Sequence, residues 1–221
     1  MKDKVIQTCM VICLLASMYY LARYAAQYTM NQRQADVQKI VLIDAGHGGA
    51  DPGKVGINGA LEKDINLQVA RKVREKLEAR GLEVVMTREE DIMQGGKKED
   101  LNKRIQLIEK SKAELVVGIH QNSFTDPEVK GAQVFYYSES EEGKAAAQVM
   151  QESLKTVDPS NEREIKANSS FFMLKNTKRT TIIVECGFLS NPEEAGSLVN
   201  NEYQEQLAEA ICSGIMKWLD K

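Results

Sequence analysis

The sequence predicts an α/β fold: a single doubly wound domain with a mostly parallel sheet flanked by helices, preceded by one N-terminal transmembrane helix. Three observations predict it. Apolar strand-like runs alternate with amphipathic helical stretches from residue 39 onward, both histidines of the chain follow or close such a run, and residues 5–22 carry no charge. The composition, 43% hydrophobic and 28% charged with a net charge of −3, is that of a globular protein without a basic nucleic-acid surface.

The uncharged segment 5–22 lies between two lysines and an arginine. As a helix it would span about 27 Å, close to the ~30 Å of a hydrocarbon core. No A-x-A cleavage site stands at a suitable position, so we expect an uncleaved membrane anchor with the following domain outside the cytoplasm. A buried core helix is the alternative. The predicted organisation is an anchor over residues 1–23, a polar stalk over 24–38 and a folded domain over 39–221.

From residue 39 the elements alternate. Apolar and β-branched runs predict strands over residues 40–45, 82–86, 115–120, 132–137 and 180–184. Apolar side chains at helical spacing predict helices that begin near residue 62 and stop at Gly81, then 98–112, 140–157, a short helix after Pro192, and 202–219. Residues 158–170 are the least structured by composition, and 171–174 form a short apolar piece.

The glycine-rich stretch 48–55 resembles a phosphate-binding loop, because it fits G-x-x-x-x-G-K. Val55, however, stands where a magnesium-binding Ser or Thr is required. Pro52 and the glycines that follow also prevent the helix that such a loop must open. The sequence therefore disfavours a nucleotide-hydrolysing enzyme.

His47 and His120 both lie where a buried strand meets a loop, which is the ligand-binding edge of an open α/β sheet. A catalytic zinc site needs three nitrogen or oxygen ligands and one open position, and two histidines with a glutamate form one such set. Glu62, at the start of the first helix of the domain, is the candidate acid. Spacing alone favours another role for Glu62, a first-turn acid that interacts with the helix dipole.

Glu185 follows a β-branched strand and precedes Cys-Gly-Phe. A carboxylate in such a place is costly unless it is paired or used, and it suits a general base beside a metal. Cys186 is an alternative nucleophile with His120. Strand alternation directs Cys186 away from the face that carries Glu185, which disfavours that alternative.

Five ordered segments carry a resemblance to a known family: DAGHGGADPG, LEKD, MTR, GIHQNS and VECGFLSNPEEA. They occur in the order found in the zinc-dependent N-acetylmuramoyl-L-alanine amidases, and the resemblance covers residues 39–221. It implies one zinc ion per chain, held by His47, Glu62 and His120, and a catalytic role for Glu185. Gly118 and Ser123 depart from the usual residues of the family, but neither is a ligand position.

The implied reaction is hydrolysis of the amide between N-acetylmuramic acid and L-alanine in peptidoglycan. Asn122 is expected to hydrogen-bond the substrate, with a turn-forming role as the alternative. Ligands drawn from separate elements could bind zinc weakly alone, so an accessory protein could support the metal.

The small size and the stretches LEKD, KAELVVGIH and GAQVFYY most resemble the germination-specific amidases of spore-forming bacteria. That resemblance implies formation of muramic-δ-lactam in spore cortex. It also places the anchored enzyme at the cell membrane, with its catalytic domain in the cell envelope or the forespore intermembrane space. The alternatives are a vegetative autolysin with the same chemistry and a catalytically silent wall-binding or activator protein.

Overall fold

The computed structural model describes residues 2–35 and 39–220, which form parts of two compact units, residues 1–38 and 39–221. The described residues of the first unit form a single helix, α1 (Lys2–Ala35). This helix continues through most of the predicted stalk, of which residues 36–38 lie outside the described part of the chain. Within the described residues, no helix is both long enough and apolar enough to cross a membrane, so the predicted transmembrane helix is not supported.

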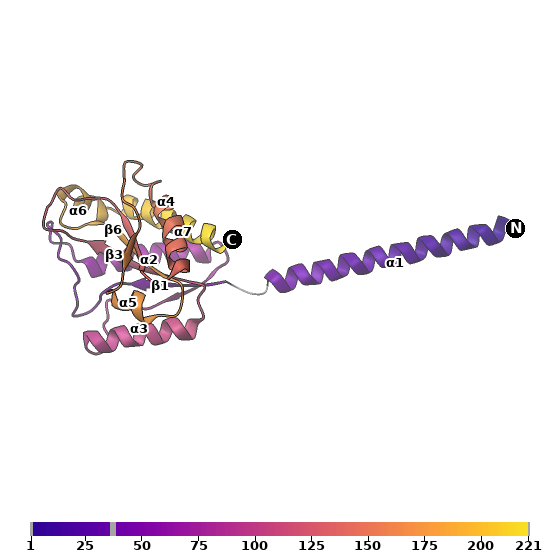
Figure 1. The fold of residues 1–221 in the computed structure, drawn as a ribbon, viewed down its shortest axis with the longest axis horizontal. Coiled ribbons are helices and arrows are strands. Elements are labelled where there is room, and N and C mark those ends of the chain that lie inside the picture. The colour runs from indigo at the N-terminus through magenta and orange to yellow at the C-terminus, as the bar shows by residue number, and fades with distance from the viewer. Residues whose placement is uncertain (1, 36–38, 221) are drawn as a thin grey trace. The chain divides into compact units, whose positions relative to one another are not determined.

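The second unit contains the predicted α/β domain, built on one six-stranded sheet (Figure 1). Its strands are β1 (Ile40–Ala45), β2 (Glu83–Met86), β3 (Leu115–Asn122), β4 (Gln133–Tyr137), β5 (Lys166–Asn168) and β6 (Thr181–Phe188). Its helices are α2 (Glu62–Glu78), α3 (Lys97–Ser111), α4 (Glu141–Leu154), α5 (Phe172–Asn176), α6 (Pro192–Leu198) and α7 (Asn201–Leu219).

The strand order is β2-β1-β3-β6-β4-β5. The first four strands are mutually parallel, whereas β4 pairs antiparallel with β6, and β5 runs parallel to β4. The prediction of a single α/β domain with a mostly parallel sheet is therefore confirmed. The carboxyl ends of β1, β3 and β6 meet at one edge, because these three adjacent strands run in the same direction.

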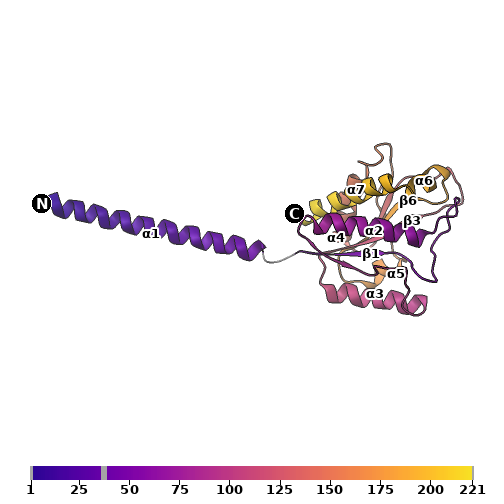
Figure 2. The same cartoon turned by 180° about the vertical axis from the view of Figure 1, so that it is seen from behind.

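Helices cover both faces of the sheet, as Figures 1 and 2 show for α2, α4 and α7 on one side and α3 and α5 on the other. Strand alternation produces these two layers. Val41 and Ile43 of β1 pack in the core with α2, α4 and α7, while Leu42 packs with Ile108 of α3 and Met173 of α5. The doubly wound arrangement thus follows from strands that are apolar on both faces.

Two predicted boundaries are wrong in ways that affect the site. The strand predicted over 180–184 extends as β6 to Phe188, so Glu185 lies inside the strand and not at its end. The strand predicted to close at His120 extends as β3 to Asn122. Residues 158–170, expected to be the least structured, contain β5. The short apolar piece predicted over 171–174 falls largely in the helix α5, which lines the pocket described below.

Candidate active site

The loop after β1 brings His47 to the edge of the sheet, and its glycines make room for the neighbouring side chains. A Cβ atom on Gly46 would stand 2.2 Å from Cε1 of His120, and one on Gly53 would stand 2.5 Å from Oε2 of Glu62. Both distances are far below van der Waals contact. Glycine is therefore required at these two positions because the side chains of His120 and Glu62 lie directly against the backbone.

Three predicted residues converge at this edge: His47 from the loop, Glu62 from the first turn of α2 and His120 from β3. Oε1 of Glu62 lies 3.2 Å from Nε2 of His47 and 3.0 Å from Nδ1 of His120. The two imidazole centroids are 5.2 Å apart, with the rings at 77°. Each residue offers one potential ligand atom, and these three atoms all lie within 4.8 Å of one another. The three residues therefore form a candidate metal centre.

Backbone and side-chain donors orient the Glu62 carboxylate. The backbone N–H of Gln121 donates to Oε1 at 3.2 Å, and the backbone N–H of Lys54 donates to Oε2 at 2.8 Å. Burial raises the pKa of Glu62, but hydrogen bonds with His120 and His47 outweigh it, so the pKa falls well below its usual range. Glu62 is therefore a carboxylate, the form that can bind a metal ion.

Burial alone would lower the pKa of His120. The hydrogen bond with Glu62 and the charges of Glu185 and Glu62 raise it instead, to about 9. Two acids thus create a place for positive charge at this imidazole, and a dication would occupy it in place of the proton. The donor set consists of two imidazoles and the carboxylate of Glu62, which is only 4% exposed. This set fits zinc.

Glu185 stands beside this group because β6 pairs with β3 in a register that sets His120 opposite Glu185. The side chain is 8% exposed, and burial raises its pKa to about 7. Its Oε2 atom has no hydrogen-bond partner among the described residues. A buried carboxyl group with a pKa near neutrality and a free oxygen is suited to accept and return a proton.

A pocket of about 360 Å³ opens in front of His47, His120 and Glu185. Its apolar lining is formed by Phe171, Phe172, Met173, Leu101 and Ile183. Asn122 also lines the pocket, but its Oδ1 accepts a hydrogen bond from the backbone N–H of Ser123 at 2.8 Å. Asn122 thus lines the pocket while its amide oxygen is bonded to the neighbouring backbone, and its role stays a prediction.

Cys186, the alternative nucleophile, lies on the opposite face of β6. Its side chain is fully buried in the core shared with α7, and burial raises the pKa of its thiol to about 12. A thiol that stays protonated and faces away from the pocket is not a nucleophile for this site.

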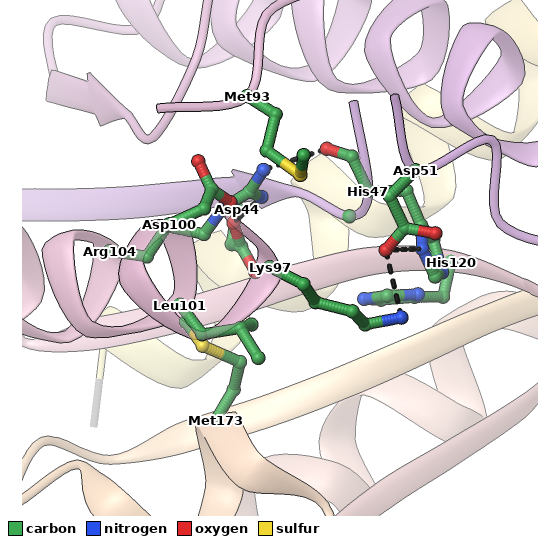
Figure 3. Close-up of a pocket in the computed structure, with 11 residues that line it drawn as sticks. Asp44, His47, Asp51, Met93, Lys97, Asp100, Leu101, Arg104, His120 and Met173 are labelled. Carbon is green, nitrogen blue, oxygen red and sulfur yellow. Dashed lines mark hydrogen bonds and ion pairs between the residues drawn. The ribbon is translucent and has the colours of Figure 1, made fainter. Parts of the chain in front are cut away.

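Two residues beside His47 were not predicted from the sequence. Asp51 lies 3.0 Å from Nδ1 of His47, and Nζ of Lys97 lies 2.9 Å from the same oxygen of Asp51 (Figure 3). A carboxylate on the second ring nitrogen orients a metal-binding histidine. The position of Asp51 four residues after His47 was the available signal, whereas nothing in the local sequence marks Lys97.

Comparisons with known proteins agree with this geometry. A germination-specific N-acetylmuramoyl-L-alanine amidase of Bacillus subtilis (strain 168) is 38% identical over 189 residues, which cover 81% of this chain and 79% of the relative. The structure of the CwlD amidase from Clostridioides difficile in complex with the GerS lipoprotein matches with a TM-score of 0.80 at 38% identity, over 83% of this chain and 99% of the other.

The crystal structure of an N-acetylmuramoyl-L-alanine amidase from Clostridium difficile 630 matches with a TM-score of 0.78 at 33% identity, over 83% of this chain and 98% of the other. The Amidase_3 family, described as N-acetylmuramoyl-L-alanine amidase, matches residues 41–217. The residues that match this family, 41–217, include His47, Glu62, His120 and Glu185. The chain therefore belongs to the N-acetylmuramoyl-L-alanine amidase family of peptidoglycan hydrolases, the family that its sequence motifs resemble.

Proposed function

We propose that the chain is a zinc amidase whose single ion is held by His47, Glu62 and His120. The observation that carries the proposal is the convergence of these three side chains around Oε1 of Glu62, with Glu185 on the neighbouring strand. When bound there, zinc would supply Lewis acidity that polarises the scissile carbonyl and lowers the pKa of a water molecule toward ~7.

Glu185 carries the proton chemistry in this proposal. Its free Oε2 accepts the proton of the attacking water, and its elevated pKa lets the same oxygen return that proton to the amine of the departing L-alanine. Asn122 faces the same pocket, where its amide can bind the peptide or the sugar beside the scissile bond. Asp51 holds the His47 ring in orientation.

We further propose that the product serves muramic-δ-lactam formation in spore cortex. The support is the 38% identity to a germination-specific amidase. Deleting the gene and analysing cortex muropeptides by mass spectrometry tests this role: muramic-δ-lactam should disappear, and re-expression should restore it. Unchanged lactam content, together with a defect in vegetative cell separation, would assign the enzyme to autolysis instead.

An accessory protein that supports zinc binding is part of the proposal. Its support is that the ligands come from three elements, a loop, a helix and a strand, together with the complex of the similar CwlD amidase with the GerS lipoprotein. We also propose that the catalytic unit lies outside the cytoplasm, in the cell envelope or forespore intermembrane space, because the proposed substrate is peptidoglycan. Fractionation of the full-length protein and protease treatment of intact protoplasts test this location and the attachment through residues 5–22.

The direct test of the chemistry uses purified full-length protein. Metal analysis should find one zinc per chain, and digestion of peptidoglycan should release peptides with a free L-alanine amine. A folded His47→Ala, His120→Ala double variant that still releases these peptides would show that the zinc assignment is wrong.

A further inference from the structure

The side chain of Arg104, in α3, contacts the loop that carries His47 (Figure 3). It is 5% exposed and uses each of its three nitrogens. Nη2 donates to the carbonyl oxygen of His47 at 2.7 Å, Nη1 donates to that of Ala45 at 2.8 Å, and the remaining bonds reach the carboxylates of Asp44 and Asp100, both at 2.7 Å. The guanidinium therefore links the loop to β1 and α3.

A second buried guanidinium, that of Arg88, completes the contact with the loop. Its Nε donates to the carbonyl of Ala45 at 2.8 Å, and Nη2 donates to that of Gly46 at 3.0 Å. Three successive carbonyl groups, those of residues 45, 46 and 47, thus accept hydrogen bonds from two arginines. Arg104 donates to the carbonyl of His47 itself, whereas Arg88 donates to the two carbonyl groups before it.

His47 needs such support because its backbone is left-handed, with φ of 62°. For a residue with a Cβ this conformation is unfavourable and persists only where surrounding contacts impose it. The hydrogen bond from Arg104 orients the peptide group that follows His47. It thereby restricts ψ, and with φ this angle sets where the imidazole points.

Two buried carboxylates pair with Arg104, those of Asp44, which is 3% exposed, and Asp100, which is 8% exposed. A lysine could keep one ion pair, but its single ammonium cannot reach both carboxylates and both carbonyl groups from one position. The position therefore requires a planar guanidinium that can donate to four separate acceptors, and another positively charged side chain would not make the same contacts.

We infer that Arg104 is a positioning residue for the metal centre: it holds the carbonyl of His47 so that the imidazole stands within reach of Glu62 and His120. The inference rests on the proposed function, since it takes the centre to bind zinc. Arg104 makes no hydrogen bond to the side chains of His47, Glu62, His120 or Glu185 in the described structure. Its effect on the metal centre therefore acts through the backbone of His47.

The test is Arg104→Lys in the full-length protein, with the zinc dissociation constant measured by competition with a chromogenic chelator. The matched control is Gln151→Ala. Gln151 is 5% exposed and makes two hydrogen bonds to the backbone of Val134 and Ala132, away from the site. Both variants should lower the melting temperature, but only Arg104→Lys should weaken zinc binding, by roughly 10 to 100-fold. Added zinc should restore its activity, with the KM for peptidoglycan fragments unchanged.

A folded Arg104→Lys protein with zinc affinity within twofold of wild type would overturn the inference. If that variant does not fold, Asp100→Asn replaces it. This change removes the charge that pairs with Nε of Arg104, while the amide oxygen can still accept from the backbone N–H of Gln94. It should reduce zinc affinity by a smaller factor, and unchanged affinity would again overturn the inference. Wild-type protein that binds no zinc would instead refute the proposed function, so the two failures are distinguishable.

Discussion

Gly46→Ala is the sharpest perturbation of this site, because one added methyl group meets a proposed metal ligand directly. The new Cβ would lie 2.2 Å from Cε1, 2.4 Å from Nε2 and 2.7 Å from Nδ1 of His120, against an ordinary contact of 3.4–4 Å. The backbone of Gly46 lies outside the left-handed region, so the conflict is steric and not conformational. Relief therefore requires the imidazole or the loop to move by about 1 Å or more.

Such a shift is incompatible with ligation, since metal–ligand distances tolerate about ±0.2 Å. We expect zinc affinity to fall on the order of 100-fold and activity to fall with it. The stability cost should be about 1–3 kcal/mol, the range for an extra methyl group in a packed interior. The loss of zinc should thus be large while the protein stays folded.

The assay measures zinc affinity, melting temperature and peptide release for Gly46→Ala beside a control, Gly196→Ala. Gly196 lies in α6 with nothing within 4 Å of its Cβ position. Alanine there should be neutral or stabilising by up to ~1 kcal/mol and should leave zinc binding intact. A folded Gly46→Ala protein that binds zinc as tightly as wild type would refute the packing argument.

Three further outcomes are expected. Glu185→Gln should retain zinc but lose roughly 10² to 10⁴-fold in turnover, because the amide cannot accept the proton; loss of zinc from this variant would assign Glu185 a different role. Glu62→Gln should instead lower the zinc content itself, since a neutral amide is a poorer ligand for a dication, and a normal zinc content would exclude Glu62 as a ligand. In metal-free protein, Glu185→Gln should become more stable relative to wild type as pH rises, as chemical denaturation at pH 4 and pH 8 would measure. The pKa of Glu185 is raised from 4.5 to about 7 in the folded protein, so between these two pH values folded wild type binds more protons than unfolded wild type. As pH rises through this window, the free energy of unfolding of wild type should therefore fall by on the order of 2–3 kcal/mol. A constant difference in stability between the two proteins would contradict this.

The sequence by itself determined which residue types lie at the site and the elements that carry them. Apolar runs identify β1 and β3, and the spacing of apolar residues identifies α2 and α7, because these signals are local and follow the periods of strand and helix. The motif order alone indicated the family, which the comparisons show. The roles of His47, Glu62, His120 and Glu185 stay predictions that the variants above test.

Only the tertiary structure decided which of these residues meet. The register that sets His120 opposite Glu185 pairs two residues more than sixty positions apart, so local sequence patterns do not specify it. The antiparallel pairing of β4 and the wall formed by α5 have the same non-local origin. Arg104 shows the limit most clearly. In sequence it is an arginine on an amphipathic helix, and only folding buries it against the carbonyl of His47, because three of its four acceptors lie far away in the sequence, in β1 and the loop that follows it.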